Sequence, residues 1–185
     1  MPPLNLRLMW SCFFIKNLEV RELVLMAFYI ALFMVLDVLT NAIPFFQMPN
    51  GGSWGLSTIP LLLASYQFGW KKGTFLCLIA VLLMFVTGPM YTPDFAGFLL
   101  DYLIAFGVYG LASLFPNIGW FYSGVLITNA LRFVSSTLSG VWVWGVDWWG
   151  SIVYQASYMI PTTVLGLVFV PLLFRALKPM MKKAA

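Results

Sequence analysis

The stretch GFLLDYLIAFGVYGLASL, residues 97–114, decides how the rest of the sequence is interpreted. It is a long apolar run without proline, and its length approaches the roughly 20 residues that a helix needs to cross a bilayer. One carboxylate, Asp101, interrupts the run, and Tyr102 follows it directly. A charged side chain inside a membrane helix costs about 2.5–3.5 kcal/mol on insertion scales, so such residues are usually functional. Asp101 is therefore expected either to neutralise a cation of the protein or to bind a cation from outside.

The composition of the whole chain predicts an all-α integral membrane protein. Of its 185 residues, 62% are hydrophobic and 9% are charged, whereas a soluble domain carries about 25% charged residues. The absence of histidine excludes histidine-based catalysis and histidine–zinc sites. The two cysteines, Cys12 and Cys77, form neither a disulfide framework nor a metal motif. We therefore expect that the protein is not an enzyme, that it binds no metal or cofactor, and that nucleic acid is not among its partners.

Hydrophobic runs separated by glycine and proline predict a compact bundle of six transmembrane helices. The second and third runs are short, which favours a bundle with a cavity over a wide pore. The six predicted spans are residues 22–44, 56–68, 73–88, 96–115, 119–140 and 150–177. The predicted organisation is an N-terminal lead-in (1–21), a substrate-binding transmembrane domain (22–178) and a basic C-terminal tail (179–185).

The basic residues predict that both termini are cytoplasmic. With six crossings, nine of the ten fall on one side of the membrane, the side that the positive-inside rule assigns to the cytoplasm. The nine are Arg7, Lys16, Arg21, Lys71, Lys72, Arg175, Lys178, Lys182 and Lys183. The tenth, Arg132, lies within the fifth predicted span. This distribution places the protein in the cell membrane as a multi-pass protein.

Three ionisable residues are expected at membrane depth: Asp37, Asp101 and Arg132. At 1.5 Å of rise per residue, Asp101 lies roughly 8 Å and Arg132 roughly 12 Å from the outer ends of their spans. Two interpretations stay open for these two residues. They form a salt bridge, or Asp101 faces an outward cavity for a cationic ligand and Arg132 shapes its floor. Asp37, closer to the surface, is expected to snorkel or to cap its helix.

Aromatic residues are concentrated on the predicted outer loops, above all in WVWGVDWW, residues 142–149. These tryptophans are either an interfacial belt or a lid over a pocket. Aromatic rings beside a carboxylate favour a flat organic cation, since each cation–π contact contributes about 0.5–2 kcal/mol. The candidate walls of such a pocket are Trp54, Tyr102, Trp144, Trp148 and Tyr154.

Two further features concern transport. Ala27 and Ala31 form a small-x-x-x-small pair, which permits close contact within the bundle or with a separate membrane subunit. The phosphate-binding motif G-x-x-x-x-G-K-[ST] is missing, so active transport requires energy from a partner or an ion gradient. The alternatives are a stand-alone secondary transporter or channel for a small organic cation, in which internal repeats are common, and a membrane-embedded enzyme. The sequence contains no evident internal repeat.

Three stretches resemble a known family: PNGGSWGLSTIPLLLAS (49–65), GPMYTP…DYLIAFGVYGLASLF (88–115) and LRFVSSTLSGVWVW (131–144). Together they resemble the thiamine-binding S components, the ThiT-like group, of energy-coupling factor (ECF) vitamin transporters. The resemblance implies a six-helix protein that captures thiamine outside the cell. It also implies a transmembrane coupling subunit and two cytoplasmic ATPases as partners, with Ala27 and Ala31 on the docking surface.

The resemblance also implies binding residues. The acid–Tyr pair of the family falls on Asp101 and Tyr102, where the family usually has Glu-Tyr. Its basic residue in the fifth span falls on Arg132, its tryptophan on Trp144 and its tyrosine of the sixth span on Tyr154. Asp101 is then expected to face the positive charge of the thiazolium ring. The rings of Tyr102, Trp144 and Tyr154 are expected to enclose the rings of thiamine.

Two positions depart from the family pattern. A histidine often found in the fifth span is Ser136 here, and an asparagine of the sixth span is Met159, with Gln155 and Ser157 nearby. Ser136 and Gln155 are the expected polar contacts to the pyrimidine. A thiamine precursor and a repacked thiamine site both fit these changes.

Overall fold

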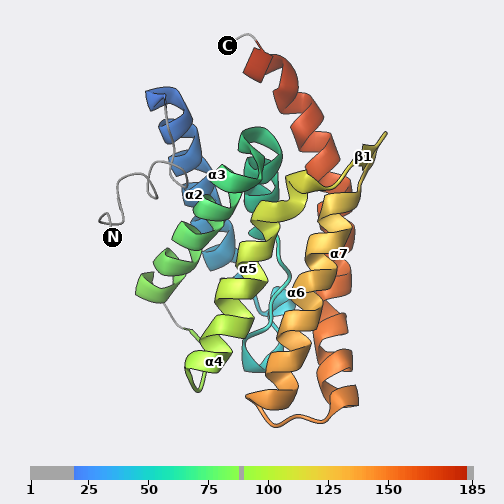
Figure 1. Ribbon diagram of the computed structural model, residues 1–185. Helices are drawn as coiled ribbons and strands as arrows, with labels where there is room; N and C mark the ends of the chain where they lie inside the picture. Colours follow the sequence, from blue (N-terminus) through green and yellow to red (C-terminus); the bar gives the residue numbers. More distant parts are fainter. Residues whose placement is uncertain (1–18, 88–89, 183–185) are drawn as a thin grey trace, which may run out of the picture.

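The computed structural model describes residues 19–87 and 90–182 of the chain (Figure 1). The N-terminal lead-in therefore lies almost wholly outside the described residues, as does the end of the C-terminal tail. The proposed division of the chain stays a prediction. Helices make up most of what is described, in agreement with the all-α class.

The long helices are α2 (Val20–Ala42), α3 (Thr58–Thr87), α6 (Ser123–Trp142) and α7 (Trp148–Lys182). A fifth helical stretch, residues 95–114, changes its winding along its length. It consists of α4 (Phe95–Phe98), the π-helical η3 (Leu99–Ile104), α5 (Ala105–Gly107) and the 3-10 helix η4 (Val108–Leu114). Short elements complete the fold: η1 (Pro44–Phe46), η2 (Pro49–Gly51) and the antiparallel pair β1 (Asn117–Ile118) and β2 (Phe121–Tyr122).

The second and third predicted spans belong to one element, α3, so the described residues contain five helical stretches rather than six separate helices. The backbone of Gly69 is not helical, with φ 81° and ψ 168°, a conformation that glycine adopts without a steric penalty. A Cβ atom on Gly73 would lie 2.8 Å from the Cα atom of Ser65. In a straight helix, residues eight apart are separated by about 12 Å. The chain therefore turns back at Gly69, and α3 is a pair of helical segments.

By length and composition, four of these stretches could cross a membrane when both segments of α3 are counted together: residues 20–42, 58–87, 95–114 and 148–178. Within the described part of the chain, α6 is the long helix that does not meet this criterion. It carries Asn129 and Arg132 together with a run of hydroxyl side chains at Ser135, Ser136 and Thr137. This composition belongs to a helix that presents a polar face to the inside of the protein.

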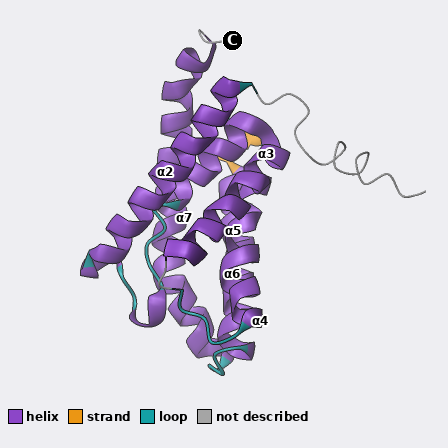
Figure 2. Ribbon diagram, turned by 90° about the vertical axis from the view of Figure 1, so that its left-hand side faces the viewer, coloured by secondary structure: helices purple, strands orange, loops and turns teal. Residues whose placement is uncertain are grey.

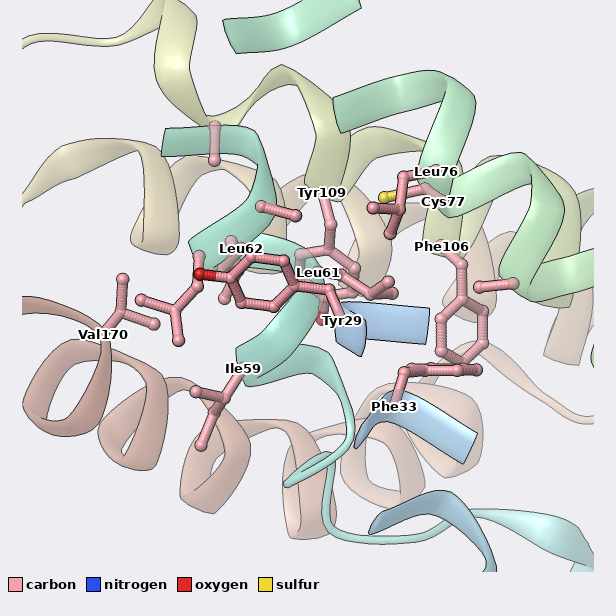
Figure 3. Close-up of a cluster of buried hydrophobic side chains, with 14 of the residues drawn as sticks. Tyr29, Phe33, Ile59, Leu61, Leu62, Leu76, Cys77, Phe106, Tyr109 and Val170 are labelled. Carbon is pink, nitrogen blue, oxygen red and sulfur yellow. The ribbon is translucent and has the colours of Figure 1, made fainter. Parts of the chain in front are cut away.

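A buried apolar core joins α2 and α3 to the 95–114 stretch and α7 (Figure 3). Phe33 of α2 packs edge to face against Phe106, with ring centroids 6.0 Å apart. Leu61, Leu62 and Leu76 of α3 have no exposed surface. Inside a bilayer, such contacts stabilise through van der Waals packing, because lipid tails are as apolar as leucine. The core fixes the helices around it and leaves the neighbouring polar side chains to form a site.

The two ends of the bundle differ in chemistry. Glu22, at the start of α2, forms an ion pair with Lys72, just after the turn at Gly69. Arg175 of α7 donates to the carbonyl oxygen of Gly119 at 2.6 Å and lies over the ring of Trp120. These basic residues lie at the end that carries the C-terminus, whereas the long loops lie at the opposite end (Figure 1).

Candidate binding site

A cavity of about 960 Å³ opens at the loop end of the bundle. Its wall combines side chains from α2, α6 and α7 with the η3 turn and the loop between α2 and α3. Figure 2 shows α2 and α6 on different sides of this end, with loops running between them. Its volume lies within the roughly 300–1,000 Å³ typical of small-molecule sites.

Asp101 lies on the cavity wall and is half-buried. It belongs to the π-helical turn, a rare winding that often occurs at functional sites. Its Oδ2 atom accepts a hydrogen bond from Ser139 Oγ at 2.6 Å and one from Trp144 Nε1 at 3.4 Å. Since a carboxylate has about four acceptor positions, these two donors leave capacity for a ligand.

Arg132 also lines the cavity, but it forms no ion pair within 4 Å among the described residues. Its Nη1 atom donates to the Tyr109 hydroxyl at 3.2 Å, and its guanidinium lies 4.5 Å from the ring centroid of Phe106. The Tyr109 hydroxyl in turn donates to Asn129 Oδ1 at 2.9 Å. The arrangement corresponds to the second interpretation of the sequence, in which Arg132 forms part of the floor, and not to a salt bridge with Asp101.

Three of the predicted aromatic residues reach the cavity: Tyr102, Trp144 and Tyr154. Tyr102 follows Asp101 in the π-helical turn, and its hydroxyl accepts from the backbone N–H of Tyr91 at 3.0 Å. Its ring stacks near Phe106, with centroids 6.4 Å apart and planes 16° apart. Trp144 presents its indole N–H to Asp101. A carboxylate and aromatic rings thus line the same cavity.

The loop between α2 and α3 forms part of the cavity wall, and its glycines lie close to tyrosine side chains. The hydroxyl of Tyr154 accepts from Gly52 N–H at 3.1 Å and donates to the carbonyl oxygen of Pro49. A Cβ atom on Gly52 would approach Tyr154 and Tyr158 to 2.9 Å, and one on Gly51 would approach Tyr91 to 2.7 Å. The adjacent glycines are therefore required for the close approach of this loop to the tyrosines.

Gln155 and Ser136, the two predicted polar contacts, also line the cavity. Gln155 donates from Nε2 to the carbonyl oxygen of Ser136 at 3.2 Å and accepts from the Tyr158 hydroxyl. Because both ends of its amide are engaged, Gln155 holds Tyr158 and α6 in place. The Ser136 side chain is buried beside them.

Two predicted wall residues do not lie on the cavity. Trp54 packs against Phe45 and Phe46, with ring centroids 5.6 and 5.5 Å away, and lies outside the lining. Trp148 is 53% exposed and begins α7 with its side chain outside the lining. The positions of Trp54 and Trp148 depend on the conformation of the loops, which a tryptophan-rich composition does not specify.

Asp37, Phe106 and Tyr158 are among the cavity-lining residues that were not predicted from the sequence as binding residues. Asp37 was expected to snorkel or cap, but it is half-buried on the cavity wall. The helical spacing of residues along α2 indicates that Asp37 faces the inside of the protein. The buried residues Phe33 and Thr40 lie four before and three after Asp37, which places this acid on the inner face of the helix.

The fold and the cavity define a multi-pass membrane protein with a cavity that is lined by acids and aromatic rings. Comparison with known proteins identifies the family. Residues 23–182 match the family model described as "Thiamine transporter protein (Thia_YuaJ)", and the chain belongs to this family. This match confirms the resemblance found in the sequence motifs.

Two known proteins are similar to this chain, one in sequence and one in fold. The Thiamine transporter ThiT of Bacillus subtilis (strain 168) is 27% identical over 188 residues, which cover 90% of this chain and 97% of that protein. The solved structure of ThiT from Listeria monocytogenes has the same fold, with a TM-score of 0.67 at 18% identity. That match covers 90% of this chain and 98% of the other.

Proposed function

We propose that this protein binds thiamine, or a close analogue or precursor, from outside the cell as the substrate-capture subunit of an ECF-type importer. One observation carries the proposal: a half-buried carboxylate, Asp101, shares a cavity wall with the indole of Trp144 and the ring of Tyr102. A carboxylate beside ring faces provides both charge and shape for a flat organic cation. The family to which the chain belongs supports thiamine as that cation.

In the proposed complex, the thiazolium charge lies near Asp101, and the rings of thiamine lie against Trp144, Tyr102 and Tyr154. Ser136 supplies a hydroxyl at the pyrimidine end, and Gln155 holds the wall behind it. Arg132 keeps the floor positive, which orients a cationic ligand away from the floor and toward the acid. The loop that carries Gly51 and Gly52 lies over the ligand.

The proposed topology has six crossings, with the two segments of α3 crossing separately and both termini in the cytoplasm. The basic end of the bundle then faces the cytoplasm, as the positive-inside rule requires, and the cavity opens outward. Because the sequence has no phosphate-binding loop, we assign the energy for transport to partner ATPases acting through a transmembrane coupling subunit.

Titration of the detergent-purified protein with thiamine tests the binding proposal. Trp144 lies at the cavity, so its fluorescence is expected to be quenched by thiamine and, at higher concentrations, by the separate pyrimidine and thiazole halves. The tighter binding of the whole molecule follows from joining two subsites in one ligand. A lack of response to thiamine in both fluorescence and calorimetry would refute the proposed ligand.

The double substitution Ala27→Trp with Ala31→Trp is expected to abolish thiamine uptake by cells and to leave thiamine binding by the purified protein unchanged. Both alanines are exposed on α2 and lie one turn apart, so bulky rings there block close helix contact without entering the core. Uptake is measured with labelled thiamine in cells that express the coupling subunit and both ATPases.

Val164→Trp is the matched control, because Val164 is a 55% exposed residue of α7. Normal uptake by the alanine double variant would place the coupling contact elsewhere. Uptake by the purified protein alone in liposomes would favour the alternative, a stand-alone secondary transporter for a small organic cation.

A further inference from the structure

A second acid, Asp37, lines the same cavity as Asp101 but comes from a different helix. Asp101 lies in the 95–114 stretch, whereas Asp37 lies near the end of α2. Arg132 comes from α6, which lies across this end of the bundle from α2 (Figure 2). The three residues therefore contribute charge to one cavity from three separate elements.

The hydrogen bonds of Asp37 leave its carboxylate available. Oδ1 accepts from Ser57 Oγ at 3.3 Å, and Oδ2 accepts from Asn41 Nδ2 at 3.3 Å. Both distances are at the long end for hydrogen bonds of these types. Within the described residues, Asp37 forms no ion pair. A half-buried acid with only two weak neutral donors destabilises a membrane helix, and such residues usually have a function such as ligand binding.

The charges of the cavity do not balance. Its described lining contains two carboxylates and one guanidinium and no other ionisable acid or base apart from tyrosine. Arg132 attracts both carboxylates but lies within ion-pair distance of neither. With all three groups charged, one negative charge is left, and it attracts a cationic ligand that enters the cavity.

We propose that Asp37 is a specificity-determining residue of the binding cavity, which together with Asp101 and Arg132 sets a fixed charge of minus one and so selects organic monocations. This inference rests on the proposed function and extends it to a residue that the family resemblance did not indicate. Asp37 and Asp101 act on the ligand charge from two helices, so each contributes to affinity for a cation and neither contributes to affinity for an uncharged ligand of the same shape.

The test compares thiamine with an uncharged isostere in which carbon replaces the thiazolium nitrogen. Asp37→Asn is expected to weaken thiamine binding by about 10-fold or more and to change binding of the isostere by less than about twofold, because only a charged ligand senses the lost carboxylate. Affinities are measured by isothermal titration calorimetry on the full-length protein in detergent. Asp37→Glu, which keeps the charge, is expected to retain the preference for thiamine.

Two control variants separate charge from structure. Glu19→Gln removes the same charge at an exposed residue outside the cavity, and it is expected to leave both affinities unchanged. Ser57→Ala removes the hydrogen bond to Asp37 but keeps the carboxylate, so the preference for the cation is expected to remain.

If Asp37→Asn lowers the affinities for thiamine and for the isostere equally, Asp37 only supports the fold. If neither affinity changes, Asp37 does not act on the ligand. Either result overturns the inference while thiamine binding by the unmodified protein still stands. Failure of the unmodified protein to bind thiamine overturns both proposals together.

Discussion

Replacement of Asp101 by Asn is expected to weaken thiamine binding by at least about 30-fold, since loss of one partner of a buried charge interaction costs about 2–5 kcal/mol. Asn keeps the size of the side chain and a carbonyl oxygen that accepts from Ser139 and Trp144, so the cavity wall keeps its shape. What disappears is the charge nearest the proposed position of the thiazolium ring. Isothermal titration calorimetry measures this loss without relying on Trp144, whose fluorescence is sensitive to its contact with Asp101.

Asp101→Glu and Glu19→Gln are the controls for this experiment. The first retains the charge and is expected to bind far more tightly than Asp101→Asn, and the second changes the net charge outside the cavity. Affinity of Asp101→Asn within about fivefold of the unmodified protein, less than 1 kcal/mol, would mean that Asp101 does not face the ligand charge.

Substitution of Gly110 by Ala is expected to lower the midpoint of thermal unfolding by about 10 °C, through a loss of about 3 kcal/mol of stability. A Cβ atom on Gly110 would lie 2.2 Å from the Cα atom of Thr74, a backbone atom that cannot move alone. The carbonyl oxygen of Gly110 also accepts from Ser65 Oγ at 2.6 Å, so α3 and η4 are joined at this point. The substitution therefore separates two packed segments and breaks a buried hydrogen bond.

Gly107→Ala is the matched control on the same helical stretch. Its added Cβ atom would meet only the end of the Leu78 side chain, at 3.9 Å, which is an ordinary contact. The unfolding midpoint of Gly107→Ala is expected to stay within about 2 °C of the unmodified protein, in line with a small change in packing. Equal midpoints for the two variants would show that α3 and η4 do not pack as closely as described.

Several features of the site followed from local sequence. Asp101 and Tyr102 are adjacent within an apolar run, so a membrane helix with an acid on it could be predicted without knowledge of its neighbours. The aromatic loop after α6 was also evident, but composition did not distinguish Trp144 from Trp148. The first presents its indole N–H to Asp101 and the second lies outside the cavity, a difference set by the loop that follows α6.

The sequence by itself determined the class of the protein, the helical runs, the acid at position 101 and the family, because hydropathy and motifs are properties of neighbouring residues. The break between residues 68 and 73, where α3 folds back at Gly69, also followed from the sequence. The tertiary structure alone decided that Arg132 lies on Phe106 and Tyr109 without an ion pair to Asp101, and that Asp37 joins the same cavity. These features depend on contacts between segments far apart in the chain. The physical reason is that the direction of a side chain is fixed only when its helix packs against the others.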